Sequence, residues 1–346
     1  MKTIFIQDAA IDEYIAGVLL STFPSIDLQQ IILLHGDCVA GPAMDAAWRI
    51  QTYIDQPTNI LSLAHSRSWN QFPWEYRKDS VLLNNIPCLR NIPSNPQWPA
   101  YHQQQDEDYL PYHRLDSTLG SNHPVNVTHH PYPDGDRALT QQLENALAQQ
   151  EKLLLIVCCP LTLIASVLQA NPHLEAAIDC MLWMGGAVNG AAGNLDPNTL
   201  PREIASPYAE WNVFWDPYAV AWIFANTDFP ITLFPLNVTN QASLTQEFLD
   251  GLKRQAAHSP LSRLAWESYQ LVLDQPFYSL WDVTTVVYRE RPDLFSEPQP
   301  QQLAIITDGF YQGTLIPQQG GRNVDVILDI TQPAAFYEYV LRQLNA

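Results

Sequence analysis

The chain has 346 residues, a formal net charge of −19 and 47% hydrophobic residues, enough for one large domain or two ordinary ones with a sizeable core. This charge, with no Lys/Arg run, argues against nucleic acid and anionic membranes as partners. Asp8 and Asp12 interrupt the apolar N-terminal run too early for a signal-peptide core or a spanning helix. Five cysteines without a CxxC pair indicate buried thiols, so we expect a cytoplasmic protein.

Strand-like apolar runs alternate with segments of helical periodicity along most of the chain. The expected strands are residues 2–7, 27–35, 58–64, 152–158, 180–184, 230–236, 302–307 and 323–330. The expected helices are residues 12–22, 41–55, 136–150, 161–170, 215–226, 243–257, 259–274, 283–290 and 332–344. Such alternation predicts an α/β fold, with an open, mainly parallel central sheet and helices on both faces.

One stretch departs from this alternation. Residues 66–135 are rich in Pro, Gln, Asn, His and Trp, and we interpret them as an irregular insertion that could cover the C-terminal edge of the sheet. His113, His129 and His130 lie in it without the spacing of a zinc site, so they are interpreted as loop residues. With no internal repeat and no clean linker, residues 1–346 are expected to form a single domain.

Three acidic residues follow the first expected strand. Asp8, Asp12 and Glu13 stand in the turn between residues 2–7 and the helix that begins near residue 12. Open α/β sheets bind ligands at this edge. Three carboxylates repel one another unless a cation or a proton lies among them, and an all-oxygen set favours Ca²⁺ or Mg²⁺. Acids that complement a helix macrodipole are the simpler explanation of the same pattern.

Further polar and glycine-rich motifs come at the ends of the other strands. Each has an ordinary structural explanation as a turn, a helix start or a cap, but their joint order along the chain is harder to dismiss. In chain order they are His35-Gly36-Asp37, Cys158-Cys159-Pro160-Leu161-Thr162, Met184-Gly185-Gly186, Gly193-Asn194, Glu210-Trp211-Asn212 with Asp216-Pro217, and Trp281-Asp282.

Taken together these motifs resemble the nucleoside hydrolases, which cleave the N-glycosidic bond of ribonucleosides with the help of Ca²⁺. The resemblance runs from residue 2 to about residue 335 and is weakest over 80–135. It implies that Ca²⁺ is held by Asp8, Glu13, Asp282 and the main-chain carbonyl of Cys158. It also implies that Asp12 takes a proton from water as the general base. Asn194, Glu210 and Asn212 would hold the ribose hydroxyls, with Met184 packed nearby and Trp211 as a further substrate-binding residue. Asp37 would contact the base.

Within the family the chain looks most similar to the purine-preferring inosine–adenosine–guanosine branch. Trp281 stands where other members carry a histidine that protonates the leaving base, and it would stack on the purine. Tyr76 would supply the second stacking ring, with Trp74 as the alternative. Stacking on an indole favours a cationic ring, which would help the base to leave. The implied partner is a small nucleoside; the choice between a homodimer and a homotetramer is left open.

Three departures from the family pattern keep other functions open. Glu13 replaces the second of two paired aspartates, Ala9-Ala10 replaces a pair that contains glycine, and Leu163 replaces an asparagine. A non-catalytic nucleoside- or sugar-binding relative and a pyrimidine-preferring hydrolase are therefore alternatives. A phosphohydrolase with an aspartate nucleophile is disfavoured, because Ala10 occupies the second acidic position of the D-x-D motif that this chemistry usually needs.

Overall fold

The computed structural model describes residues 1–36, 40–70, 79–98, 132–195, 200, 203–275 and 277–346. Within them the strands form one sheet in the order β3-β2-β1-β4-β5-β6-β9-β7-β8. Their bounds are β1 Lys2–Gln7, β2 Asp27–His35, β3 Leu61–Arg67, β4 Leu153–Cys158, β5 Ile178–Met184, β6 Ile231–Phe234, β7 Gln299–Ile305, β8 Leu315–Pro317 and β9 Arg322–Val326.

Neighbouring strands from β3 to β9 in this order pair in parallel, whereas β7 runs antiparallel to both β9 and β8. The predicted open, mainly parallel α/β sheet is therefore confirmed, with an antiparallel end that the sequence pattern did not predict. The strand β8 was not predicted, because three residues are too few to show the alternation of apolar and polar residues that marks a strand.

The helices follow the expected segments with a few additions. Their bounds are α1 Ile11–Thr22, α2 Ala40–Tyr53, α3 Asp79–Leu83, α4 Gly135–Gln149, α5 Thr162–Ala170, α6 Trp211–Trp215, α7 Pro217–Asn226, α8 Leu236–Thr239, α9 Gln246–Gln255, α10 Pro260–Tyr269, α11 Trp281–Glu290 and α12 Pro333–Leu344. Short 3₁₀ helices are η2 Pro172–Ala177, η3 Gln270–Val272 and η4 Pro292–Leu294. The helix expected over 215–226 is α7, which begins at Pro217; the short α6 that ends just before Asp216-Pro217 was not expected.

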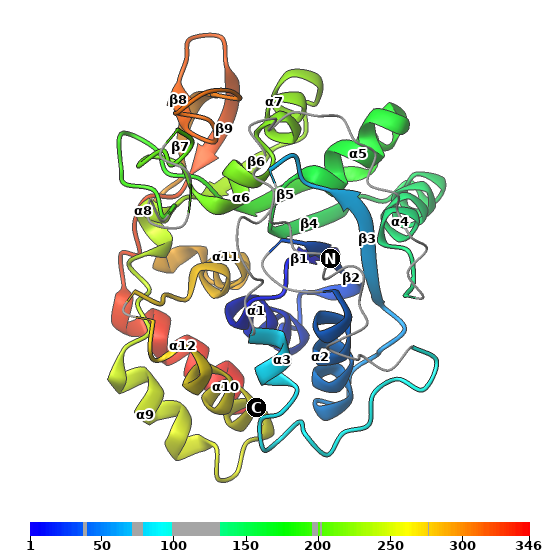
Figure 1. Ribbon diagram of the computed structural model, residues 1–346, viewed down its shortest axis with the longest axis vertical. Coiled ribbons are helices and arrows are strands. Elements are labelled where there is room, and N and C mark those ends of the chain that lie inside the picture. Colours follow the sequence, from blue (N-terminus) through cyan, green and yellow to red (C-terminus); the bar gives the residue numbers. More distant parts are fainter. Residues whose placement is uncertain (37–39, 71–78, 99–131, 196–199, 201–202, 276) are drawn as a thin grey trace.

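Helices cover both faces of the sheet, as predicted. Figure 1 shows α4, α5 and α7 on one side and α1, α2, α10 and α12 on the other. Successive strand residues point to opposite faces, so Phe5 and Ile156 join one buried cluster while Ile4 and Leu155 join the other. No helix among the described residues combines the length and the apolar character that a membrane span requires.

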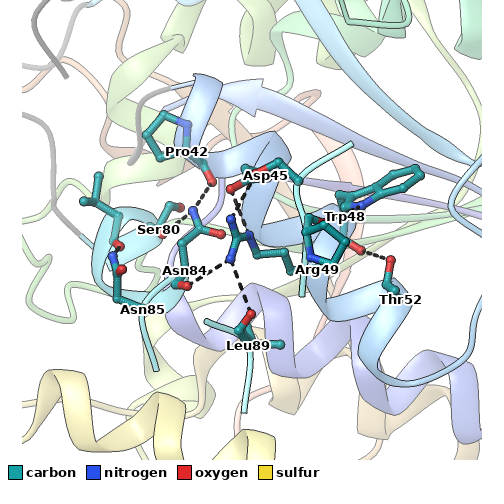
Figure 2. Close-up of polar contacts among 12 residues, drawn as sticks. Pro42, Asp45, Trp48, Arg49, Thr52, Ser80, Asn84, Asn85 and Leu89 are labelled. Carbon is teal, nitrogen blue, oxygen red and sulfur yellow. Dashed lines mark hydrogen bonds and ion pairs between the residues drawn. The ribbon is translucent and has the colours of Figure 1, made fainter. Parts of the chain in front are cut away.

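Arg49 of α2 links part of the irregular segment to the body of the protein through hydrogen bonds (Figure 2). Its guanidinium donates to Asp45 Oδ2 over 2.9 Å, to the carbonyls of Asn84 and Leu89 over 3.4 Å each, and to Ser94 Oγ over 3.0 Å. The carbonyls and Ser94 belong to the chain from α3 onward. This network therefore holds α3 against α2, close to the turn that follows β1.

Candidate active site

A small cavity of about 70 Å³ lies at the C-terminal edge of the parallel strands. It brings together side chains that lie far apart in the sequence. Its walls are Asp8, Ala10, Asp12, Glu13, Met184, Asn194, Glu210, Trp211, Asn212, Trp215, Tyr278, Trp281 and Asp282. Asp37, Trp74 and Tyr76, which were expected to contact the base, lie outside the described residues. Cys158 ends β4 next to Gln7 of β1, which places it at the same edge.

Asp12 joins α1 to α11 through its carboxylate. Oδ2 accepts hydrogen bonds from the main-chain N–H groups of Asp282 (2.6 Å) and Val283 (3.1 Å), and Oδ1 accepts one from Tyr269 Oη (2.8 Å). Burial raises the pKa of Asp12 to about 7, although these three hydrogen bonds oppose the rise. Asp12 therefore caps the N-terminus of α11 while its carboxyl group reaches the cavity.

Asp282 is a second buried acid in the cavity wall. Burial raises its pKa well above the ordinary value, and the nearby charges of Glu13 and Asp12 raise it further. Its carboxylate is hydrogen-bonded to the side chain of Cys158, yet Oδ1 accepts no hydrogen bond from the described residues. A buried carboxylate oxygen without a donor is costly unless a proton or a cation approaches it.

The acidic side chains of the cavity are of the kind that binds a hard cation. Asp8, Glu13 and Asp282 supply oxygen only, and their crowding is the electrostatic situation that a divalent cation relieves. Among the described His, Cys, Asp and Glu side chains, no group of three stands in an arrangement that would hold a metal ion as it is.

The turn that carries Asp8 is tightly constrained. Ala9 adopts a left-handed conformation with φ of 75°, which costs an alanine about 1–2 kcal/mol. Its carbonyl accepts a hydrogen bond from Ser80 Oγ of α3 over 3.1 Å, and Ser80 Oγ lies 3.0 Å from Tyr14 Oη. A Cβ on Gly36, just past β2, would lie 2.2 Å from Asp8 Oδ2. Gly36 thus provides the space that the Asp8 carboxylate occupies.

The opposite wall is held by hydrogen bonds among its own members. Glu210 caps α6, since Oε1 accepts from Asn212 N (2.9 Å) and Oε2 from Gly186 N (2.8 Å) and Val213 N (3.3 Å). Asn212 Nδ2 donates to the Met184 carbonyl over 3.2 Å. Asn194 Oδ1 accepts from Trp211 N over 3.1 Å. The residues predicted to bind ribose therefore form one interlocked wall.

Aromatic rings close the rest of the cavity. Trp281 Nε1 donates to Asn240 Oδ1 over 2.9 Å, and its ring meets Tyr278 edge to face with centroids 4.9 Å apart. Trp211 lies against Trp215 with centroids 5.5 Å apart. Trp281 is therefore held by contacts within the protein itself.

Asp216-Pro217 and Thr162 have a structural role, in the ends of two helices. Asp216 caps α7 by accepting from Ala219 N over 2.9 Å, and its Oδ2 accepts from Thr162 Oγ1 of α5 over 2.7 Å. Neither residue lines the cavity. These motif residues tie two helices together behind the site.

Sequence reasoning missed Tyr269, Tyr278 and Trp215. Tyr278 and Trp215 line the cavity, and Tyr269 holds Asp12. Tyr278 could have been suspected, because it stands three residues before Trp281 in an expected turn. Tyr269 lies on a helix at a core position, and nothing local distinguishes it from a packing residue.

Comparison with known proteins identifies the family of the chain. A family model described as inosine-uridine preferring nucleoside hydrolase matches residues 3–338. The non-specific ribonucleoside hydrolase RihC of Escherichia coli (strain K12) is 30% identical over 210 residues, which are 59% of this chain and 64% of RihC. The chain thus matches less than two thirds of the length of that relative.

Solved structures share the fold over nearly the whole chain. An inosine-uridine preferring nucleoside hydrolase from Bacillus anthracis superimposes with a TM-score of 0.77 at 26% identity, covering 99% of both chains. A purine-preferring ribonucleoside hydrolase from Gardnerella vaginalis gives a TM-score of 0.72 at 16% identity, covering 100% of this chain and 98% of its own. The chain therefore belongs to the nucleoside hydrolase family.

Proposed function

We propose that this protein hydrolyses the N-glycosidic bond of ribonucleosides, giving a free base and ribose, with purine ribonucleosides preferred. The observation that carries the proposal is the cavity itself. It combines buried carboxylates on α1 and α11 with the interlocked Glu210, Asn212 and Asn194 wall and with fixed tryptophans. Acids that can activate water thus face polar groups suited to sugar hydroxyls, beside rings suited to a base.

A Ca²⁺ ion is proposed as the cofactor, held by Asp8, Glu13, Asp282 and the main-chain carbonyl of Cys158. The oxygen-only side chains and the donor-free Oδ1 of Asp282 support this choice. When bound, such a cation would make a water molecule in the cavity more acidic. Glu13 reaches about one carbon–carbon bond further than an aspartate, which changes where its carboxylate can meet the ion.

Asp12 is proposed as the general base. Its pKa of about 7 suits proton transfer near neutral pH. Its two oxygens accept three hydrogen bonds, and a carboxylate offers about four lone-pair sites, so it retains room for a water. The water oxygen then adds to C1′ as the bond from C1′ to the base nitrogen breaks. Asp8 lines the same cavity and is the competing candidate for this role.

Purine preference is proposed from the rings. Trp281 is held by Asn240 and Tyr278, so it can stack on a base without first being ordered. A bicyclic purine gains more from this contact than a pyrimidine does. Among the described residues that line the cavity there is no histidine, and we propose that the leaving base takes its proton from solvent or becomes more basic through stacking.

A panel of ribonucleosides tests the proposal directly. We expect ribose release from inosine, adenosine and guanosine at higher kcat/KM than from uridine and cytidine, and its loss after chelation. Preference for uridine would make the protein a pyrimidine-preferring hydrolase. Binding without turnover in the presence of Ca²⁺ would instead indicate a non-catalytic relative, the alternative motivated by Glu13 standing where the family has an aspartate.

A further inference from the structure

A large recess lies where strands β6 and β9 begin, whereas the cavity lies where the parallel strands end. The two strands pair only at Thr232 with Asp325 and at Leu233 with Val326, and the recess opens between the residues that precede these pairs. Its volume is about 820 Å³, within the range of about 300–1,000 Å³ that is usual for small-ligand pockets. Of the described residues, none lines both the recess and the cavity, so the recess is a separate candidate site.

Apolar side chains from three elements line the recess. They include Ala221 and Phe224 of α7, Ile231 of β6 and Leu303 of β7, and Phe229 stands just before β6. A ligand with an apolar body would bury surface against these side chains. The recess also contains charged groups, which decide what else the ligand must carry.

Arg322, at the start of β9, is a buried cation in the recess wall. Its side chain is 9% exposed, and Nη2 donates a hydrogen bond to the carbonyl of Phe229. Among the described residues, none accepts a hydrogen bond from Nε or Nη1. A guanidinium carries five N–H donors, and burying it with most of them unused is costly unless an anion meets it.

The acids around Arg322 do not fully meet this need. Asp228 Oδ1 lies 3.8 Å from Nη1, beyond hydrogen-bond distance, and the Asp228 side chain is fully exposed. Glu175 Oε1 instead accepts hydrogen bonds from the main-chain N–H groups of Asp228 and Phe229. Asp325 also lines the recess and is exposed. Water screens exposed carboxylates much more than a buried guanidinium, so the charge felt inside the recess is mainly that of Arg322.

We propose that this recess is a binding site for a small carboxylate with an apolar body. The carboxylate accepts hydrogen bonds from the Arg322 guanidinium, whose planar donors match its two oxygens. The apolar body lies against Ala221 and Phe224 of α7. Because the recess and the cavity are lined by different residues, the proposal does not depend on the proposed function.

Calorimetric titration with 2-naphthoate at low ionic strength tests the proposal, with 2-naphthylmethanol as the uncharged analogue. We expect the wild type to bind the acid about tenfold more tightly than the alcohol, or better, as suits a hydrogen bond between charged groups. Arg322→Met should remove this preference, because methionine keeps an apolar side chain and loses the charge. Arg291→Met is the matched control and should keep it. Arg291 also lies over a tyrosine ring and pairs with an aspartate, but it does not line the recess.

A second variant keeps the test decisive if Arg322→Met does not fold. Ala221 is partly exposed in the recess wall, so Ala221→Trp should fill the recess and abolish binding of 2-naphthoate while Arg322 is unchanged. Equal binding of acid and alcohol by the wild type, or no binding of either, would overturn the proposal. Binding of 2-naphthoate that survives Arg322→Met or Ala221→Trp would also overturn it, since the acid would then bind elsewhere. A preference that Arg291→Met loses as well would reduce the effect to overall charge and count against the site.

Discussion

The carboxylate of Asp12 accepts a hydrogen bond from the main-chain N–H of Asp282 over 2.6 Å, across 270 positions of sequence. The first turn of α11 is thereby tied to the first turn of α1, and two buried acids come to share one cavity. Burial raises the pKa of both acids, and the nearby charge of Asp12 adds to the rise at Asp282. This arrangement makes the site sensitive to single substitutions.

Asp12→Asn should lower turnover by about 10²–10⁴-fold, the usual contribution of a general base. The amide can keep one oxygen toward the N–H groups of Asp282 and Val283, so the cap on α11 and Ca²⁺ binding should survive. Steady-state kinetics and calorimetric Ca²⁺ titration measure the two properties. An almost fully active variant would remove Asp12 from the mechanism, and an inactive Asp8→Asn that still binds Ca²⁺ would move the base to Asp8.

Thorough chelation should abolish activity, and Ca²⁺ should restore it better than Zn²⁺, because every proposed ligand is oxygen. Asp8→Ala should behave like the chelated protein. Ca²⁺ should also raise the melting temperature of the wild type and not that of Asp8→Ala, since a bound cation relieves the repulsion among buried acids. Normal turnover in excess chelator would contradict the cation model. 2′-Deoxynucleosides should be poor substrates, because they lose a hydroxyl that would contact the ion.

Trp281→Ala should cost about 1–3 kcal/mol of transition-state stabilisation with inosine. A share of this loss should appear in kcat if stacking makes the leaving base more basic. A nitrophenyl riboside, whose leaving group needs no proton, should keep its kcat in the variant. Equal losses for both substrates would show that Trp281 contributes to binding alone.

The left-handed Ala9 offers a test of stability. Ala9→Gly should change the free energy of unfolding by no more than about 0.5 kcal/mol, since relief of the backbone strain offsets both the more flexible unfolded chain and the loss of a buried methyl group. Urea denaturation measures the change. Ala148→Gly, on the exposed side of α4, is the control and should destabilise by about 1 kcal/mol. A similar destabilisation at both positions would show that Ala9 is not strained.

The stability of the cation-free protein should fall as pH rises. Burial raises the pKa of Asp12 from 3.8 to about 7, so the folded chain holds this proton more tightly than the unfolded chain does. Its contribution to stability is therefore complete below about pH 4 and is lost as pH rises through about 7. The raised pKa of Asp282 acts in the same direction. Urea denaturation in chelator at pH 5 and pH 8 should show the loss, and Asp12→Asn should reduce it.

The sequence pattern located most of the framework because its elements are long and strongly patterned. The bounds of β1, at Lys2–Gln7, and of β2, at Asp27–His35, are the predicted ones. Pieces of three to five residues such as α3, α6, α8 and β8 were not anticipated, since so few residues show no period. The antiparallel end of the sheet depends on pairing between strands, which no local pattern specifies.

Some residues of the site could likewise be predicted from the sequence, and others could not. An acid at a strand end, such as Asp8 after β1, could be placed near the cavity because parallel strands bring their ends to one edge. Tyr269 could not, because its importance lies in one hydrogen bond to a residue 257 positions away. The sequence also could not show that residues of one motif have different roles. Only the three-dimensional contacts show that Asp216 caps a helix while Glu210 also lines the cavity.

The union of α1 with α11 has a consequence for how the protein is made. During synthesis Asp8, Asp12 and Glu13 leave the ribosome long before Asp282, so nascent chains that end before α11 carry three acids without their partner helix. Tyr269 and the N–H groups of Asp282 and Val283 arrive together late, and only then can Asp12 be capped. In a chain truncated before residue 281, Asp8, Asp12 and Glu13 should therefore stay solvated and α1 should pack poorly. The cavity can form only once the polypeptide is nearly complete.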